Sequence, residues 1–248
     1  SVTLAAGLSV EKKKPVVAIY STFLQRAYDQ LIHDVAVQNL DVTFALDRSG
    51  LVGEDGPTHS GNYDIAYLRC IPNMVICTPS DENETRKLLT TAYLHNGPAS
   101  VRYPRGTGPN SNVDKDLKPL KIGEANIINE ESSEIVILNF GTLLNEANQI
   151  SKELRATLVD MRFVKPLDEK LLRKLFKKAK VFISIEDGSI MGGAGSAVQE
   201  FASKENLNVR SILFGIPDKF IEHASREEML VEAGLDVENI KSKLSKLL

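Results

Sequence analysis

Side chains suited to acid–base chemistry and anion binding occur in one short segment of this sequence and at the ends of nearby apolar segments. The segment LVGEDGPTHSGNYD, residues 51–64, carries Asp55 and His59 among turn-forming residues, and Arg48 precedes it. Other apolar segments are followed by Tyr20, Phe23, Arg26 and Arg105. This mixture suits a flat heteroaromatic ligand with a phosphate, because arginine guanidinium groups match phosphate oxygens in a bidentate way.

Each of these residues alone has a simpler structural interpretation. Asp55 before Gly56 suits a turn, and a histidine in a Gly- and Pro-containing loop is more often a turn residue than a catalyst. Phe23 alone suits core packing, and Arg26 alone suits a solvated helix face. Only their common position at strand ends favours a functional site, and the pattern by itself identifies no reaction.

The elements that would position these side chains alternate between strands and helices. Residues 15–20, 42–47, 74–79 and 99–104 read as buried strands, and residues 1–11 have a helix-like pattern. Ser21 is the predicted N-cap of a helix that runs to about residue 40, and Ser80 that of a helix with an acidic first turn. This alternation predicts a parallel sheet, in which ligands lie beyond the carboxyl ends of the strands.

A second alternating region follows a break at residues 105–120, which are rich in Gly, Pro, Asn and Asp and read as a linker. The predicted strands cover residues 134–141, 156–163, 180–187 and 208–215. Helices are predicted from about residue 144, after Pro166, from about Ala194, and near residues 225–233 and 237–247. The sequence therefore predicts an α/β protein with two three-layer α/β/α domains, at residues 1–118 and 119–248.

The glycine-rich stretch MGGAGSAV, residues 191–198, is similar to a phosphate-binding loop. Its third glycine is missing, because Val198 stands at that position. Close packing of a helix on a strand, or a turn at an interface, is the favoured interpretation.

Composition excludes several classes of function. The chain has 248 residues, 42% of them hydrophobic, and a net charge of −3, which gives no electrostatic case for nucleic acid or an anionic membrane. Its apolar runs are far shorter than the roughly 20 residues of a membrane helix. Cys70 and Cys77 fit neither a redox motif nor a zinc motif and read as two buried thiols, and we expect no metal site in this chain.

Longer motifs carry a resemblance to a known family. AIYSTFLQRAYDQ, DRSGLVGEDGPTH, TPSDENE and VRYPRG, in this order, are similar to the pyrimidine-binding domain of the 1-deoxy-D-xylulose-5-phosphate synthase family. LVDMRFVKPLD and EDGSIMGGAGSAV are similar to its transketolase-like C-terminal domain. The resemblance implies a mostly parallel, thiamine-diphosphate-binding first domain and a transketolase C-terminal-like second domain.

The resemblance also implies a reaction and its cofactors. The family condenses pyruvate with D-glyceraldehyde 3-phosphate, releases CO₂, and supplies a precursor of isoprenoids, thiamine and pyridoxal. It uses thiamine diphosphate and Mg²⁺. The resemblance implies that Phe23 stacks on the cofactor's pyrimidine ring and that Tyr20 and Arg26 line its pocket.

The same resemblance assigns roles to four residues outside the cofactor pocket. Asp55 and His59 would face the reacting carbon as general acid–base groups. Arg48 and Arg105 would bind the phosphate of the aldehyde and orient it.

Two parts of the family's site are missing from this sequence. The cofactor-activating glutamate would precede residue 1, and the N-terminal domain that holds the diphosphate and Mg²⁺ is absent. We therefore expect a fragment that is inactive alone, from a homodimeric protein of the cytoplasm or, in a eukaryote, of a plastid-type organelle. One alternative is a subunit of a split transketolase-type enzyme, and another is a non-catalytic α/β interaction module.

Overall fold

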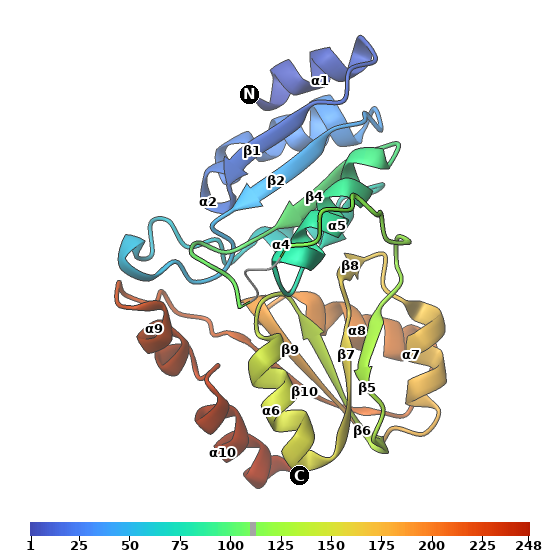
Figure 1. Ribbon diagram of the computed structural model, residues 1–248, viewed down its shortest axis with the longest axis vertical. Helices are drawn as coiled ribbons and strands as arrows, with labels where there is room; N and C mark the ends of the chain where they lie inside the picture. Colours follow the sequence, from blue (N-terminus) through green and yellow to red (C-terminus); the bar gives the residue numbers. More distant parts are fainter. Residues whose placement is uncertain (110–112) are drawn as a thin grey trace.

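The computed structural model describes residues 1–109 and 113–248 and contains two sheets with helices on their faces (Figure 1). The first sheet has the strand order β1-β2-β4-β3-β8, and its first four strands are parallel. The parallel strands are β1 (Val16–Tyr20), β2 (Thr43–Asp47), β4 (Ala99–Arg102) and β3 (Val75–Cys77), and the antiparallel strand is β8 (Phe163–Lys165). The prediction of a mostly parallel sheet is confirmed.

The helical segments of the first half are shorter than the sequence suggested. They are α1 (Val2–Val10), α2 (Ser21–Leu24), η1 (Gln25–Ala27), α3 (Tyr28–Gln30), η2 (Leu31–Ala36), η3 (Gly53–Asp55), α4 (Asp64–Arg69) and α5 (Glu82–Leu94). The single helix predicted after Ser21 is wrong, because this stretch changes from α to 3₁₀, back to α and then to π geometry. Ser21 is itself the first helical residue and Tyr20 is the cap position.

The predicted cap of α5 is also wrong. The side chain of Asp81, rather than that of Ser80, accepts a hydrogen bond from the backbone N–H of Glu84 at 2.8 Å. The hydroxyl of Ser80 donates to the buried carboxylate of Asp160 at 2.7 Å. A tertiary hydrogen bond therefore uses the hydroxyl that the sequence assigned to the helix.

The second sheet has the order β10-β9-β6-β7-β5, with β5 antiparallel and the other strands parallel. Its strands are β5 (Asn126–Asn129), β6 (Ser132–Phe140), β7 (Ala156–Asp160), β9 (Val181–Ser189) and β10 (Arg210–Ile216). The helices are α6 (Leu144–Leu154), α7 (Glu169–Phe176), α8 (Ala194–Lys204), α9 (Arg226–Ala233) and α10 (Val237–Leu247). This architecture confirms the two predicted α/β sheets.

One predicted strand is divided between the two sheets. Residues 156–163 were expected to form one strand, but β7 ends at Asp160 and the chain then crosses to the first sheet, where Phe163 pairs with Cys77. In the predicted linker, the described residues 105–109 and 113–120 contain neither helix nor strand, and residues 110–112 lie outside the described part. Strand β5 follows this linker and was not predicted.

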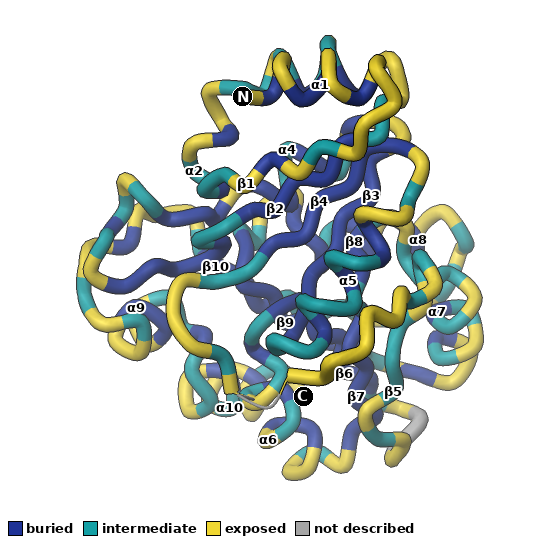
Figure 2. Tube along the Cα trace, turned by 45° about the horizontal axis from the view of Figure 1, so that its top comes forward, coloured by how far each residue is buried: buried dark blue, intermediate teal, exposed yellow. Residues whose placement is uncertain are grey.

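The two halves share a hydrophobic core. Phe44 and Leu46 of β2 belong to the same buried cluster as Val136 and Leu138 of β6. Buried residues form the centre of both sheets, and exposed residues follow the outer turns and helix faces (Figure 2). Among the residues described, no helix is both long and apolar enough to cross a membrane.

Candidate active site

The carboxyl ends of β1 and β2 lie side by side and start the candidate site. Tyr20 and Asp47 are register partners in the parallel pair. The chain turns directly from β1 into α2, which brings Phe23 back over Tyr20. The two rings stack with centroids 5.1 Å apart and planes inclined by 14°. Phe23 is 42% exposed, so it is an accessible aromatic surface rather than the core residue that its type alone suggested.

His59 lies at the edge of this aromatic pair. Its ring centroid is 5.5 Å from that of Phe23 and 6.5 Å from that of Tyr20, with interplanar angles of 67° and 61°. Its Nδ1 is 2.9 Å from the hydroxyl oxygen of Thr58. This hydrogen bond occupies Nδ1, and Nε2 is the other ring nitrogen that can donate or accept a hydrogen bond.

Asp55 connects the two arginines expected to bind phosphate. Its Oδ2 forms an ion pair with the Nη1 of Arg48 and lies 3.2 Å from the Nε of Arg105. The Cζ of Arg48 also lies 4.3 Å from the centroid of the Tyr20 ring. We call Tyr20, Phe23, Arg48, Asp55, His59 and Arg105 the strand-end cluster.

Arg26 is the one predicted site residue without a contact to this cluster. It lies in the exposed 3₁₀ turn η1. Within the described part of the chain, its side chain makes no hydrogen bond or ion pair and has no cation–π contact.

Glycines close the base of the loop that carries Asp55 and His59. The backbone N–H of Gly50 donates to Gly61 at 2.8 Å, and the N–H of Gly61 donates back at 2.9 Å. Gly50, Gly53 and Gly56 have φ values between 66° and 74°, which favour glycine. A Cβ on Gly61 would lie 2.6 Å from the Cβ of Ser21. These contacts and glycine conformations define the path of the loop at its base.

The second half of the chain supports this loop from outside. A Cβ on Gly56 would lie 3.0 Å from the Cβ of His223, and one on Gly53 would lie 3.5 Å from the carbonyl oxygen of Ala224. The segment before α9 thus packs against the loop. No role was predicted for His223, because contacts between distant segments leave no local pattern in the sequence.

The structure also contains a buried network of charged residues that was not predicted from the sequence. Arg102 at the end of β4 is 2% exposed, and its Nε lies 3.1 Å from both carboxylate oxygens of Asp64. Its Nη1 forms an ion pair with Asp187 of β9. Thr142 donates its hydroxyl to Asp187 at 2.7 Å and its backbone N–H at 3.0 Å. The network joins the two sheets directly beneath the loop.

The electrostatics of this network favour ionised groups. Burial alone would raise the pKa of Asp187, but Arg102 and the hydrogen bonds from Thr142 outweigh it, so the pKa lies below its ordinary value. Burial would likewise lower the pKa of Arg102, yet Asp187 and Asp64 raise it. The signal in the sequence was a charged residue inside the apolar segment ASVRYP.

The glycine-rich stretch at residues 191–198 surrounds a carboxylate instead of a phosphate. The buried Glu186 accepts the backbone N–H groups of Ala194 at 2.7 Å and Gly195 at 2.9 Å. Side chains on Gly193 or Gly195 would collide with Glu186 or Ser184. Burial raises the pKa of Glu186 to about 7, although the two backbone hydrogen bonds oppose this. The favoured prediction of close helix–strand packing is confirmed.

No group of three or more His, Cys, Asp or Glu side chains in the described ranges could hold a metal ion. Cys77 is buried, whereas Cys70 is exposed, so the prediction of two buried thiols is wrong for Cys70.

Comparisons with known proteins match both halves of the chain. Residues 1–110 match the family described as "Transketolase, pyrimidine binding domain", and residues 123–240 match "Transketolase, C-terminal domain". The chain is 59% identical over 241 residues to the 1-deoxy-D-xylulose-5-phosphate synthase of Pseudomonas aeruginosa PAO1 and 57% identical over 242 residues to that of Pseudomonas fluorescens Pf0-1. These matches cover 97% and 98% of this chain but only 38% of each relative, so the chain spans well under half of their length.

Solved structures share the fold. A structure titled "Split gene transketolase, inactive beta4 tetramer" superposes with a TM-score of 0.84 at 26% identity, over 98% of this chain and 78% of that one. The transketolase of Campylobacter jejuni gives a TM-score of 0.70 at 20% identity, over 94% of this chain and 35% of that one. At this lower identity the similarity concerns the fold alone.

Proposed function

Since this chain belongs to the transketolase family and carries its pyrimidine-binding and C-terminal domains, we propose that it is part of a 1-deoxy-D-xylulose-5-phosphate synthase. The proposed reaction joins pyruvate to D-glyceraldehyde 3-phosphate and releases CO₂, giving 1-deoxy-D-xylulose 5-phosphate. The observation that carries the proposal is the strand-end cluster, in which a stacked aromatic pair with an exposed Phe23, a histidine and an arginine-bound aspartate lie together.

The aromatic pair fits the aminopyrimidine ring of thiamine diphosphate. Phe23 stacks on Tyr20 and is itself 42% exposed, so a flat heteroaromatic ring can pack against it. When bound, this cofactor supplies the electron sink that decarboxylation of pyruvate requires. In this proposal Arg26 lines the same pocket, as the family resemblance implies. The ligands of the diphosphate and Mg²⁺ come from outside this chain.

His59 is proposed as the general acid–base group. Thr58 holds Nδ1, and Nε2 is left to donate a proton to, or accept one from, the reacting oxygen of the substrate. The edge-on position of the ring against Phe23 places it beside the stacking surface.

Asp55 is proposed to hold the phosphate-binding arginines in place. Its Oδ2 pairs with both Arg48 and Arg105. A phosphate brings more acceptor oxygens than one carboxylate and can draw the guanidinium groups away from Asp55. Asp55 is then available to the reacting centre, so binding of the aldehyde phosphate and exposure of the carboxylate are coupled.

A second candidate function rests on the split-gene transketolase, whose structure covers 98% of this chain. The chain would then be one subunit of a transketolase-type enzyme whose partner supplies the remaining cofactor ligands. For the synthase we propose a homodimeric assembly, and for either function a location in the cytoplasm or a plastid-type organelle.

One experiment separates the two functions. This chain replaces the matching 241-residue segment of the Pseudomonas aeruginosa enzyme, and we call the product the synthase chimera. Release of ¹⁴CO₂ from [1-¹⁴C]pyruvate that depends on glyceraldehyde 3-phosphate supports the synthase. Transfer of a two-carbon unit from a ketose phosphate, without CO₂ release, supports the transketolase-type alternative. If the folded chimera binds thiamine diphosphate and does neither, the catalytic proposal is wrong.

A further inference from the structure

The end of β9 lies against the base of the loop of residues 51–64, which we call the His59 loop. The backbone N–H of Ser189 donates to the carbonyl oxygen of Asn62 at 2.7 Å. At the other side of the base, a Cβ on Gly50 would lie 2.8 Å from the backbone carbonyl oxygen of Asp187. A strand of the second half of the chain therefore contacts the loop base where the loop begins and where it ends.

The side chain of Arg102 connects Asp187 to the carbonyl group of Gly61. Its Nη1 forms an ion pair with Asp187, and its Nη2 donates to the carbonyl oxygen of Gly61 at 3.4 Å. The same guanidinium group is also held by Asp64, whose two carboxylate oxygens both lie 3.1 Å from Nε. Because a guanidinium group is planar and rigid, these contacts fix the direction in which it donates to Gly61.

Gly61 is only two residues from His59, and the intervening backbone is held by further hydrogen bonds. Ser60 is 5% exposed, and its hydroxyl donates to the carbonyl oxygen of Gly56 at 3.1 Å. The backbone N–H of His59 donates to the same oxygen at 3.1 Å. A displacement of Gly61 would therefore move His59 as well, and with it the contact between the His59 and Phe23 rings.

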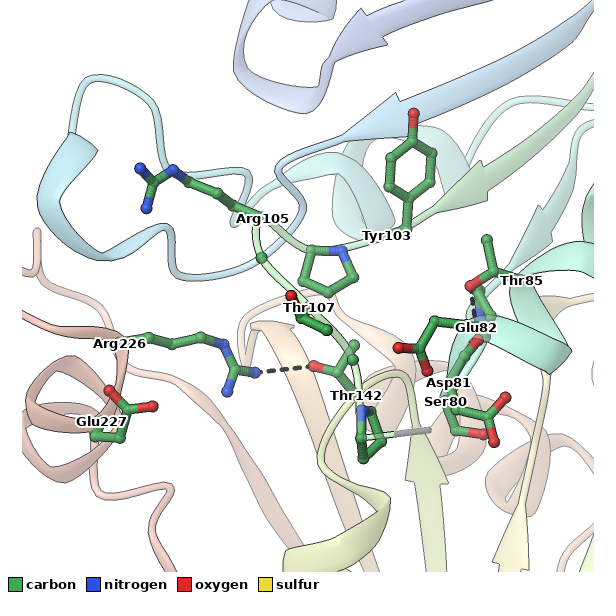
Figure 3. A pocket seen from close by; sticks show the side chains of 15 residues that line it. Ser80, Asp81, Glu82, Thr85, Tyr103, Arg105, Thr107, Thr142, Arg226 and Glu227 are labelled. Atoms are coloured by element: carbon green, nitrogen blue, oxygen red, sulfur yellow. Dashed lines mark hydrogen bonds between the residues drawn. The ribbon is translucent and has the colours of Figure 1, made fainter. Parts of the chain in front are cut away.

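Asp187 is itself held by the turn after β6. Thr142 in this turn donates its backbone N–H and its hydroxyl to the Asp187 carboxylate, at 3.0 and 2.7 Å. The hydroxyl oxygen of Thr142 also accepts a hydrogen bond from Arg226 at 3.0 Å (Figure 3). A Cβ on Gly141 would lie 2.7 Å from each carboxylate oxygen of Asp187, so the glycine makes room for them. The second half of the chain thus fixes the carboxylate that Arg102 meets.

Stability alone does not require charged residues at this place. Apolar side chains of similar size often stabilise a buried contact as well as an ion pair does, or better. They cannot, however, supply a directed hydrogen bond to a backbone carbonyl group. The charged network is therefore suited to fixing a position, and the position it fixes is that of Gly61.

We infer that Asp187 is a positioning residue for the proposed reaction, because it holds Arg102 against the carbonyl group of Gly61 and so places the His59 ring beside Phe23. The inference rests on the proposed function for the role of His59. It gives the second half of the chain a part in the acid–base step, although the residues expected to act in that step, Asp55 and His59, come from the first half.

The first test observes the position of His59 in the 248-residue chain by NMR and needs no turnover. The chain has only four histidines, so their ring signals can be assigned by ¹³C labelling and single substitutions. We expect a nuclear Overhauser effect between the His59 and Phe23 rings, whose centroids are 5.5 Å apart. Asp187→Asn keeps the shape of the side chain and removes its charge. It should shift the His59 signal and weaken this effect, while the signals of His33 and His95 stay in place.

Glu84→Gln is the matched control. Glu84 of α5 pairs at 2.7 Å with Arg162, in the segment that joins β7 to β8, and both side chains are largely buried. This variant therefore loses another ion pair between the two halves. Thr142→Val removes the hydroxyl that donates to Asp187 and should shift the His59 signal, whereas Thr142→Ser retains the hydroxyl and should not. These two variants provide the test if Asp187→Asn does not fold.

Two NMR results overturn the inference. One is a His59 signal that Asp187→Asn and Thr142→Val move no more than Glu84→Gln does. The other is a His59 signal that Thr142→Ser moves as far as Thr142→Val, because the hydroxyl would then not matter.

The second test measures turnover by the synthase chimera, with kcat expressed per bound thiamine diphosphate so that unfolded protein does not count. Asp187→Asn should lower kcat about tenfold or more and change the KM for pyruvate less than about twofold, because a displaced acid–base group slows the reaction more than it weakens binding. Glu84→Gln should keep the full kcat. An unchanged kcat for Asp187→Asn, in a chimera that turns over, overturns the inference. A chimera that never turns over, with a His59 signal that still depends on Asp187, rejects the proposed function and supports the positioning of His59 by Asp187.

Discussion

Replacing Arg102 by leucine should strongly destabilise the protein, because it leaves two buried carboxylates without their counter-ion. The side chains of Arg102, Asp64 and Asp187 are 2%, 0% and 8% exposed. Removing one partner of a buried ion pair costs roughly 3–5 kcal/mol. That is a large part of the about 5–15 kcal/mol by which a domain is stable. We expect a loss in this range at pH 7, measured as the change in unfolding free energy from urea titrations followed by circular dichroism.

The pH dependence of this loss gives a second check on its cause. Arg102 lowers the pKa of Asp187 in the folded protein, so its contribution is complete above the ordinary aspartate pKa and is lost as the pH falls through the lowered value. In Arg102→Leu the carboxylate of Asp187 is buried without this cation, which raises its pKa. As the pH falls, the folded variant therefore takes up a proton before the unmodified protein does. The difference in unfolding free energy between the two proteins should narrow between pH 7 and pH 5.

A matched control and a rescue complete this experiment. Arg173→Leu removes an arginine whose side chain is 42% exposed and pairs with Glu205 at the surface. This variant should change the midpoint of urea unfolding little. Adding Asp187→Asn to Arg102→Leu removes one stranded charge and should restore part of the stability. The counter-ion explanation would be refuted if Arg102→Leu lowered the unfolding free energy by less than about 1 kcal/mol at pH 7, or if this decrease did not become smaller on acidification.

Three further predictions concern single features of the site and its support. Phe23→Ala in the synthase chimera should weaken thiamine diphosphate binding about two- to tenfold, measured by fluorescence titration. The thermal unfolding midpoint should not change, because Phe23 is 42% exposed. An unchanged affinity would argue against stacking of the cofactor on Phe23. Gly61→Ala should lower the thermal midpoint, since its Cβ would lie 2.6 Å from that of Ser21, and an unaltered midpoint would mean that the loop base can shift freely. Burial raises the pKa of Glu186 from 4.5 to about 7, so between these pH values the folded state holds a proton that the unfolded state has lost, and the unfolding free energy should fall as the pH rises. Glu186→Gln should remove this dependence of the unfolding free energy on pH, measured by urea titrations. The same dependence in the variant would show that Glu186 does not cause it.

The sequence was most informative about the parallel strands and the residues that follow them. Alternation of apolar segments with helical periodicity predicted both sheets, and the rule that ligands lie at carboxyl strand ends predicted that Tyr20, Phe23 and His59 would meet. In the structure these three residues lie close to one another, and Arg48, Asp55 and Arg105 belong to the same cluster. Their chemical roles stay predictions.

The features that were missed depend on contacts between distant segments. Ser80 looked like a helix cap, but its hydroxyl bonds to Asp160, which is 80 residues away in sequence. Residues 156–163 were predicted as one strand, but Phe163 belongs to β8 in the other sheet, and a three-residue strand is too short to be recognised from its sequence pattern. Arg102 was not predicted to have a role because its partner Asp187 lies 85 residues from it along the chain.

The most direct test of the proposed function is the rate of aldehyde-dependent ¹⁴CO₂ release by the synthase chimera with and without His59. His59→Ala should lower this rate about 100-fold or more while thiamine diphosphate still binds, because a general acid–base group contributes on that scale. His33→Ala, in the π-helical segment η2, is the control and should keep the full rate. A His59→Ala chimera that turns over as fast as the unmodified one would contradict the account.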